Sequence, residues 1–194
     1  MSRAPHPPLG GAREVVIRCT QSQREQERAT MGMIDEFANN PGPAIRGMWE
    51  KLSSKPGGKY LFSKSVGWAA PYTGTIDGRV ITFEPGYCQV ELKDRRKVRN
   101  HFRSVHAIAL MNLGEMATGV AMCSAFPAGV RGIVTGLTID FSKKARGTLV
   151  CTSRVELPEI TESMEFQAEG VIHDKSGDEV ARVTAKWKVG PSKK

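Results

Sequence analysis

The segment from residue 100 to residue 124, NHFRSVHAIALMNLGEMATGVAMCS, constrains the fold more than any other part of the chain. Residues 105–122 contain no proline, are mostly good helix formers and form a run too long for one strand, so they predict a helix. Ser104 is the expected N-cap, and Pro127 and Gly129 end the segment. Apolar residues occupy nearly every side of this helix, which predicts that it is buried on most of its faces.

One acidic residue, Glu115, lies in the middle of this apolar helix. A buried carboxylate is costly unless it is ion-paired, hydrogen-bonded or open to a cleft. Glu115 is therefore either the reactive group of a functional site or a structural acid paired with a basic residue such as Arg103. The histidines and the asparagine just before the helix favour the first interpretation, although Asn100 and His106 could also serve only as helix caps.

The segments on either side of the helix carry the alternating pattern of strands. Strands are predicted at 73–83, 87–92, 133–141, 148–157, 164–172 and 181–189. The residues expected to share one face of the third strand are Ile133, Thr135, Leu137, Ile139 and Phe141. Short connections make the sheet mainly antiparallel. The sequence thus predicts an α+β protein with the hotdog fold, a curved, mainly antiparallel sheet wrapped around a long central helix, with an N-terminal helical extension.

The N-terminal part differs from the rest in composition. Residues 1–30 combine a proline-rich start with the polar run QSQREQERAT, which predicts a flexible extension, and Met31 or Met33 is an alternative start. Beyond it we expect a short turn at 35–39 and a helix that begins near Pro43. Residues 31–71 are interpreted as a helical covering segment and residues 72–190 as the hotdog domain.

Charge and cysteine usage exclude few functions. A net charge of +8 is compatible with a polyanionic partner or with a basic surface alone, and no nucleic-acid motif or stacking platform accompanies it. The four cysteines show no metal-site spacing, so reduced thiols and no metal are expected. No apolar run is close to the roughly 20 residues of a membrane span, and no signal peptide is visible. We expect a cytoplasmic protein without a membrane partner.

Three residues around the helix carry a resemblance to a known family. Asn100, His106 and Glu115 are spaced six and nine residues apart. This spacing resembles the hotdog thioesterases of the phenylacetate-pathway type, which have an Asn, then His-Gly-Gly at the helix start, then an Asp or Glu. PYTGTI at 71–76 and NHFRSVHAIALMNLGEMATG are also similar to a domain of unknown function within that superfamily. The similarity covers roughly residues 40–190.

The chain departs from the thioesterase pattern at the helix entrance. Ala107 and Ile108 replace the two glycines that follow the histidine, and Arg103 stands where these enzymes often have a glycine. Ala107 retains a backbone N–H, so an oxyanion donor survives there. Ile108 would narrow or reshape the acyl tunnel.

The resemblance implies hydrolysis of an acyl-CoA or related thioester, with Glu115 as base or nucleophile and Ala107 as oxyanion donor. Asn100 would orient the water or the carboxylate, and His106 would fix the helix entrance or contact the thioester. Nine residues of helix separate His106 from Glu115 by about 13 Å along the axis and place them on opposite sides. We therefore expect a homodimer or a dimer of dimers with a composite site at the interface.

Basic residues close to the helix entrance would bind the phosphates of coenzyme A, which is part of the substrate rather than a cofactor. They are Arg95, Arg96, Arg99, Lys143 and Lys144. Two alternatives remain open. His101 and Glu115, fourteen residues apart, have the spacing of hotdog hydroxyacyl-thioester dehydratases, although the Pro and Gly that follow the histidine in those enzymes are absent. The other alternative is a non-catalytic acyl-CoA-binding module.

Overall fold

The computed structural model describes residues 39–192. The predicted extension at 1–30, the alternative starts at Met31 and Met33, and most of the predicted turn at 35–39 lie outside this range. The elements are α2 (Pro41–Leu52), α3 (Gly58–Ala69), α4 (Pro71–Gly74), β1 (Arg79–Glu84), β2 (Tyr87–Leu92), η1 (Arg96–Val98), α5 (Ala107–Ala125), β3 (Val130–Phe141), β4 (Leu149–Arg154), β5 (Met164–His173) and β6 (Glu179–Pro191).

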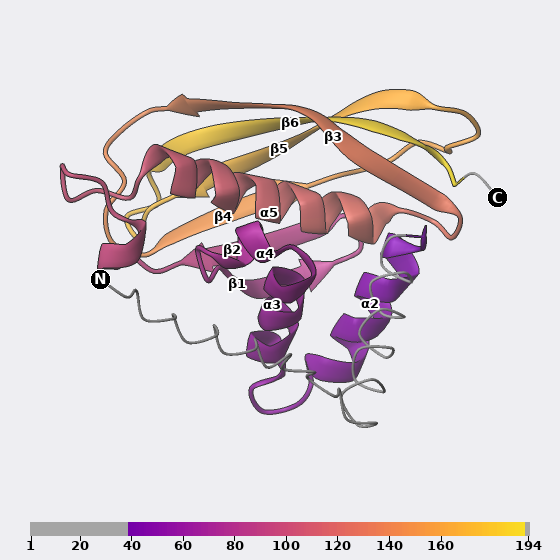
Figure 1. The fold of residues 1–194 in the computed structure, drawn as a ribbon, viewed down its shortest axis with the longest axis horizontal. Helices are drawn as coiled ribbons and strands as arrows, with labels where there is room; N and C mark the ends of the chain where they lie inside the picture. Colours follow the sequence, from indigo (N-terminus) through magenta and orange to yellow (C-terminus); the bar gives the residue numbers. More distant parts are fainter. Residues whose placement is uncertain (1–38, 193–194) are drawn as a thin grey trace, which may run out of the picture.

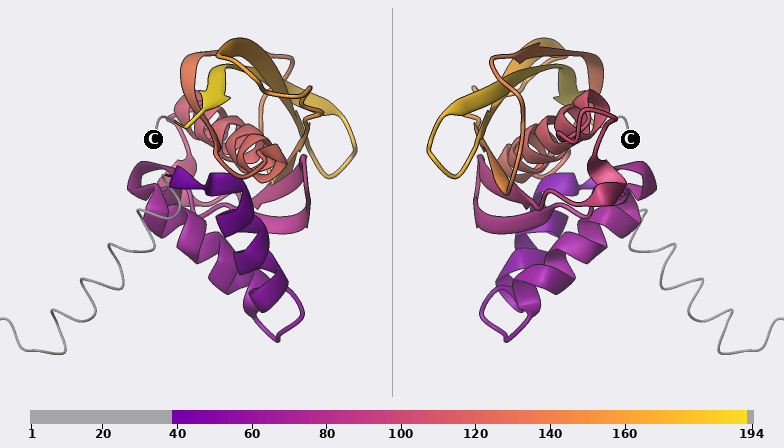
Figure 2. Two further views of the ribbon diagram at one scale, coloured as in Figure 1. Left: turned by 90° about the vertical axis from the view of Figure 1, so that its right-hand side faces the viewer. Right: turned by 90° about the vertical axis from the view of Figure 1, so that its left-hand side faces the viewer.

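The strands form one antiparallel sheet in the order β1-β2-β4-β5-β6-β3. The sheet curls around α5, which is seen nearly end-on inside it in Figure 2. Helices α2, α3 and α4 lie together on the β1 side of the molecule, away from β6 (Figure 1). The predicted α+β hotdog architecture, with helices before the sheet, is confirmed.

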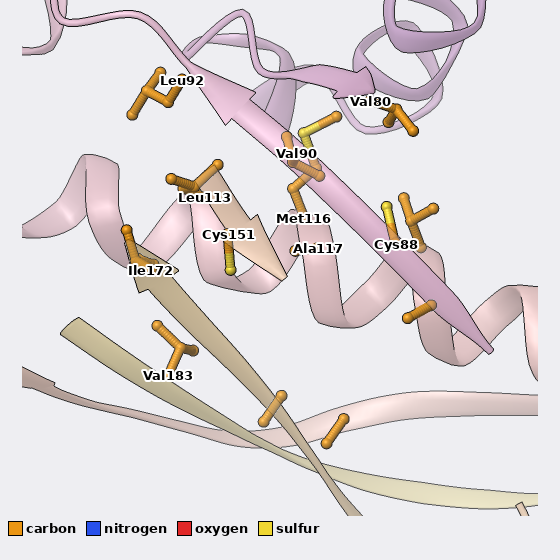
Figure 3. Close-up of a cluster of buried hydrophobic side chains, with 14 of the residues drawn as sticks. Val80, Cys88, Val90, Leu92, Leu113, Met116, Ala117, Cys151, Ile172 and Val183 are labelled. Atoms are coloured by element: carbon orange, nitrogen blue, oxygen red, sulfur yellow. The ribbon is translucent and has the colours of Figure 1, made fainter. Parts of the chain in front are cut away.

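The core lies between α5 and the concave face of the sheet, as the alternating patterns predict. The inward residues of β6 are all buried: Ala181, Val183, Ala185, Trp187 and Val189. Figure 3 shows part of this core, where Leu113 and Met116 of α5 point toward β2, which carries Val90 and Leu92. Small residues allow helix and sheet to approach closely. A Cβ on Gly114 would lie 2.3 Å from Val183 Cγ2, so only glycine fits there.

The first predicted strand, 73–83, is wrong in its first half. Residues 71–74 form the short helix α4, and β1 begins only at Arg79. Threonine and isoleucine favour strands, but Pro71 suits the first turn of a helix. Asn112 Nδ2 on α5 donates to the Tyr72 carbonyl. This tertiary contact holds the turn against α5 and overrides the local strand preference.

The predicted shared face of β3 is also partly wrong. Pairing with β6 shifts between Val134 and Gly136, so Thr135 is an extra residue in the strand. Such a bulge reverses the side-chain alternation beyond it. As a result Ile133 is 67% exposed, while Leu137 and Ile139 pack partly against the core. Phe141, at the end of the strand, is 51% exposed.

The central helix starts two residues later than predicted, and its N-cap is His106 rather than Ser104. The preceding residues are held in extended structure, because Val105 pairs with Arg99 and donates its N–H to the Ala145 carbonyl. At the other end the helix stops at Ala125, since the residue before Pro127 is disfavoured in helical geometry.

The predicted covering segment packs against β1 and against the C-terminal end of α5. The rings of Trp49 in α2 and Phe62 in α3 meet edge to face, with 4.9 Å between their centroids. The ring of Phe62 also contacts that of Phe83 in β1, with 5.5 Å between centroids. Arg46 Nη1 donates to the Ser124 and Phe126 carbonyls at 2.5 and 3.0 Å. These carbonyls at the end of α5 lack partners within the helix, so α2 caps α5 from outside.

Helix α5 is long and apolar enough to cross a membrane, which corrects the expectation that no run in the chain comes close to that length. In the structure 67% of this span is buried inside the fold. The sheet curls around the apolar helix and covers most of it, as expected for the core helix of a hotdog domain (Figure 2).

Candidate active site

Glu115 lies on the side of α5 that the sheet leaves open. Residues on this side of the helix are only partly buried or exposed, whereas the rest of α5 is buried except at its two ends: Ile108, Met111, Glu115, Gly119 and Cys123. Their spacing of three or four residues places them along one helix face. The buried acid predicted from the sequence therefore faces away from the closed core, toward an accessible surface.

The carboxylate has one hydrogen-bond partner, which comes from α4. Thr73 Oγ1 donates to Glu115 Oε2 at 3.2 Å, and the Thr73 side chain is itself buried. Burial raises the pKa of Glu115 above its ordinary value, while the Thr73 hydrogen bond partly opposes this rise. A glutamate with a raised pKa is a stronger base, which suits proton abstraction near neutral pH.

Within residues 39–192 no basic side chain forms an ion pair with Glu115. Arg103 was the basic residue expected to pair with Glu115 if that acid had only a structural role. It is exposed and makes no ion pair in this range. Glu115 is therefore not one half of a structural salt bridge. Its remaining oxygen, Oε1, has no hydrogen-bond donor in the described part of the chain.

The free oxygen borders a space that Gly119 leaves empty. A Cβ built on Gly119 would lie 3.7 Å from Glu115 Oε1 and 3.9 Å from Trp187 Cζ2. The Trp187 ring nitrogen Nε1 is buried and has no hydrogen-bond partner among the described residues. A carboxylate oxygen and an indole edge thus approach the same small space, where one helical residue has no side chain.

Asn100 organises the turn that leads into α5. Its Oδ1 accepts hydrogen bonds from the Phe102 N–H, the Ser104 N–H and the Ser104 hydroxyl, at 2.9 to 3.2 Å. The residue predicted as the N-cap, Ser104, is therefore part of this turn. The Asn100 amide nitrogen Nδ2 makes no hydrogen bond in the described range, so it is free to donate.

The helix entrance leaves the backbone N–H of Ala107 without an acceptor among the described residues. The His106 N–H donates to the Val98 carbonyl, and the Ile108 N–H donates to His106 Nδ1 at 3.1 Å. In this bond Nδ1 of His106 acts as the acceptor, so the Nε2 side of the ring is the one left to contact a ligand. The Ala107 N–H has no acceptor within residues 39–192, at the positive end of the α5 dipole.

A surface cavity of about 300 Å³ brings together several of the predicted site residues. Asn100 and Ala107 line it from the helix entrance, and Lys143 and Lys144 line it from the loop after β3. The structure thus groups two predicted catalytic residues with two predicted phosphate contacts. Glu115 does not line this cavity, and eight helical residues separate it from Ala107 by about 12 Å along the axis.

The predicted phosphate contacts divide into paired and unpaired cations. Arg95 pairs with Asp77, and Arg99 pairs with Asp94. Lys143 pairs with Asp174 and Asp178, each at 2.7 Å. Arg96 and Lys144 are exposed and form no ion pair in the described residues. An anionic ligand would have to compete with carboxylates at the first three positions.

A cavity whose wall includes Thr73, the hydrogen-bond partner of Glu115, was not predicted from the sequence. It measures about 580 Å³ and lies between α3, α4, the start of β1 and α5, with Thr73 and Met116 in its wall. Thr73, Gly119 and Trp187 were likewise not predicted as site residues, although Thr73 and Gly119 lie in the two segments that carry the family resemblance. The local sequence does not show that they meet Glu115, because Thr73 and Glu115 are 42 residues apart in the chain and come together only through the fold.

His101, the histidine of the dehydratase alternative, is exposed in the loop before α5. Its ring lies against the ring of Phe102 with 3.8 Å between centroids. Cys88, Cys123 and Cys151 are free thiols, and burial raises the pKa of Cys123 and Cys151 to about 12. Among the described residues no group of three histidines, cysteines or acids could hold a metal ion.

Comparison with solved structures places this fold among hotdog proteins. A structural-genomics target, APC5556, is 29% identical, with 76% of this chain and 98% of that chain covered and a TM-score of 0.65. The probable thioesterase PA5026 of Pseudomonas aeruginosa is 20% identical over 69% and 93% of the two chains, with a TM-score of 0.58.

The E. coli protein PaaI, from the phenylacetic acid degradation operon, is 19% identical over 67% of this chain and 97% of its own, with a TM-score of 0.53. No curated protein matches the chain. A family model described as a domain of unknown function, DUF4442, matches residues 58–189, which is more than half of the chain. This protein therefore belongs to the DUF4442 family, and it shares its fold with the solved structures named above.

Proposed function

We propose that this protein hydrolyses acyl thioesters of coenzyme A, or of a related carrier, in a site shared between two copies of the chain. The observation that carries the proposal is the state of Glu115. It is an acid with a raised pKa, one oxygen bound by Thr73 and the other beside an empty space. Solved structures of this fold that bear the name thioesterase support the reaction class.

In the proposed reaction Glu115 Oε1 takes a proton from a water molecule. The resulting hydroxide adds to the thioester carbonyl carbon, and the Ala107 N–H of the second copy stabilises the negative oxygen. The carbon–sulfur bond then breaks, and the departing thiolate takes the proton from Glu115. The products are a carboxylic acid and a thiol. The free Nδ2 of Asn100 would orient the water or the carbonyl.

The proposed dimer follows from the two surfaces that the fold leaves open. Strand β3 is a 12-residue strand at the edge of the sheet, with Ile133 and Phe141 exposed on it. A long edge strand with apolar side chains favours pairing with another strand. The open face of α5 borders this edge in Figure 1, and Ile108 on that face is 54% exposed. A two-fold pairing would therefore bring two α5 helices together.

The proposed pairing also fixes the register of the two helices. If Glu115 of one copy lies level with Ala107 of the other in an antiparallel arrangement, residue 111 lies midway and meets its own copy at the two-fold axis. Met111 belongs to the open, partly buried face of α5. A Met111→Cys variant should form an intermolecular disulfide under mild oxidation, whereas Met48→Cys on α2 should not. Equal crosslinking of both variants, or none of Met111→Cys, would reject this register.

The reaction is tested by thiol release from short, long and aromatic acyl-CoAs and from 3-hydroxyacyl-CoA, comparing wild type with Glu115→Gln. Wild type should hydrolyse at least one acyl-CoA, and the variant should lose on the order of 100-fold or more in kcat while keeping its melting temperature. Water elimination from the hydroxyacyl substrate would instead support the dehydratase. If neither protein reacts but coenzyme A thioesters raise Tm of both, the chain is a binding module.

A further inference from the structure

We infer that the phosphopantetheine arm of the substrate binds between α3, α4 and the β1–β2 hairpin, with its phosphate on the cations that follow β2 and begin β1. This inference rests on the proposed thioesterase function and names the path by which the thioester reaches Glu115. It differs from the placement predicted from the sequence, in which the phosphates lie at the entrance of α5.

The first observation is the 580 Å³ cavity, which lies next to Thr73, the hydrogen-bond partner of Glu115. Its volume lies within the roughly 300–1,000 Å³ of small-molecule sites. Much of its wall is apolar or lacks side chains: Gly67, Trp68, Pro71, Gly74, Gly78 and Met116. Thr73, which holds the Glu115 carboxylate, is another wall residue. A slender, uncharged chain that enters this cavity would therefore reach Thr73, whose hydroxyl is bound to the proposed base.

The second observation is a basic groove that continues from this cavity. The groove measures about 170 Å³ and shares Ser63, Lys64, Asp77 and Gly78 with the larger cavity. Four cations line it, Lys64, Arg79, Lys93 and Arg95, against the two acids Asp77 and Glu91. The local excess of positive charge suits a phosphate or diphosphate.

The order of the chemical groups along the substrate indicates which group binds in which cavity. In a phosphopantetheine thioester the phosphate and the thioester lie at opposite ends of one flexible arm. The basic groove, the apolar cavity and Glu115 follow one another in the same order along the protein surface. The arm therefore occupies the apolar cavity, and the acyl group lies beyond Glu115 toward the open face of α5.

Charge pairing favours this groove over the entrance of α5. At the entrance Lys143 is held by two carboxylates and Arg99 by a third. In the groove Lys64 and Arg95 pair with Asp77, whereas Arg79 and Lys93 are exposed and form no ion pair within residues 39–192, so two of its four cations remain available to a phosphate. Lys144 is the matched comparison, because it is an exposed, unpaired lysine that lines the other cavity.

The test compares Lys93→Glu with Lys144→Glu in the full-length chain, using coenzyme A binding by titration calorimetry and kinetics with an acyl-CoA. We expect Lys93→Glu to weaken coenzyme A binding and raise KM about 10-fold or more, with kcat unchanged, and Lys144→Glu to change either by less than about 2-fold. An equal or larger effect of Lys144→Glu, or no effect of Lys93→Glu, overturns the inference. Because binding is measured directly, this result stands whether or not the protein is a hydrolase.

A truncated substrate separates failure of the arm site from failure of the proposed function. The N-acetylcysteamine thioester of the same acyl group has the reactive end of the arm without its phosphate. Its Glu115-dependent hydrolysis should be equal in wild type and Lys93→Glu. Trp68→Ala, which removes a half-exposed wall residue, should raise KM for the acyl-CoA more than for this short thioester. Hydrolysis of the short substrate with no difference between the lysine variants leaves the function standing and removes the arm site.

Coenzyme A and an acyl carrier protein both present this arm, and the same variants distinguish them. An acyl carrier protein supplies one phosphate, whereas coenzyme A adds the diphosphate and nucleotide. Lys93→Glu should raise KM for both carriers if the groove binds the phosphate that they share. An effect confined to the acyl-CoA would mean that the groove binds the nucleotide end, which overturns the assignment of the arm.

Discussion

Gly114 and Gly119 lie five residues apart on α5 and have opposite surroundings. At Gly114 the helix touches the sheet, and a Cβ would lie 2.3 to 2.9 Å from three atoms of Val183. At Gly119 a Cβ would make only ordinary contacts, with the Glu115 carboxylate and the Trp187 ring. The first glycine permits close packing. The second leaves an open space at the proposed catalytic acid, where a side chain would fit without strain.

The largest expected effect is on stability, and it follows from replacing the tightly packed Gly114. Gly114→Ala should lower the free energy of unfolding by about 1–3 kcal/mol, because the β-branched Val183 cannot move away without displacing β6. This loss should appear although alanine is favoured over glycine within a helix by about 1 kcal/mol. Urea titration of the variant measures it directly.

A second-site change tests whether Val183 causes that loss. Gly114→Ala with Val183→Ala should be more stable than the sum of the two single changes predicts, since the smaller side chain makes room for the new methyl group. Strict additivity of the two effects would show that the close approach to Val183 is not what makes glycine necessary at position 114.

The open space at Gly119 gives the second effect, on activity rather than folding. Gly119→Ala should stabilise the protein by up to about 1 kcal/mol through helix propensity. The added methyl group would occupy the space beside Glu115 Oε1, where the proposed reaction places its water. We expect thioesterase kcat to fall about 10-fold, equivalent to about 1.4 kcal/mol in the barrier.

A helix glycine elsewhere serves as the matched control. Gly47 in α2 has no atom within 4 Å of its Cβ position, so Gly47→Ala should stabilise the fold without changing kcat. If Gly119→Ala gains stability and keeps full activity, like this control, the space at Gly119 has no part in the reaction.

The sequence predicted those features that depend on local pattern, namely the central helix, the strands with regular alternation and the acid inside the helix. The prediction failed where contacts between residues far apart in the sequence determine the local structure. The first part of the strand predicted over 73–83 is a helix and turn because Asn112 and Glu115 bind it from α5. Thr135 shifts the face of β3 only through its pairing with β6. The two glycines of α5 are likewise indistinguishable until Val183 lies against one of them.

The hydrogen bond from Thr73 to Glu115, the proposed base, gives the third effect, on the pH dependence of hydrolysis. The Thr73 hydrogen bond lowers the pKa of Glu115 and opposes the rise caused by burial. Thr73→Val removes that bond, so the pKa should rise further and protonation should remove the base at a higher pH. The acid limb of the kcat/KM profile should therefore move to higher pH.

Thr75→Val is the control for this shift. Thr75 follows α4 directly and its hydroxyl donates to the Tyr72 carbonyl, but it makes no hydrogen bond to Glu115. Its substitution should leave the acid limb in place. An acid limb that moves equally in both variants would indicate a general loosening of α4, and an unmoved limb in Thr73→Val would mean that Glu115 is not the group that titrates.

The smallest expected effect concerns a position that would suit a glycine but holds an arginine. Arg103 has a φ of 57°, in the left-handed region that costs a residue with a Cβ roughly 1–2 kcal/mol. The thioesterases that this chain resembles often have a glycine there. Arg103→Gly should raise the free energy of unfolding by about 0.5 kcal/mol, since the relief of strain is partly offset by the greater freedom of glycine in the unfolded chain.

Arg103→Ala removes the same exposed side chain but keeps the Cβ, so it should give no such gain in urea titration. Equal stability of the two variants would show that, unlike Gly114 and Gly119, this position does not depend on the absence of a side chain.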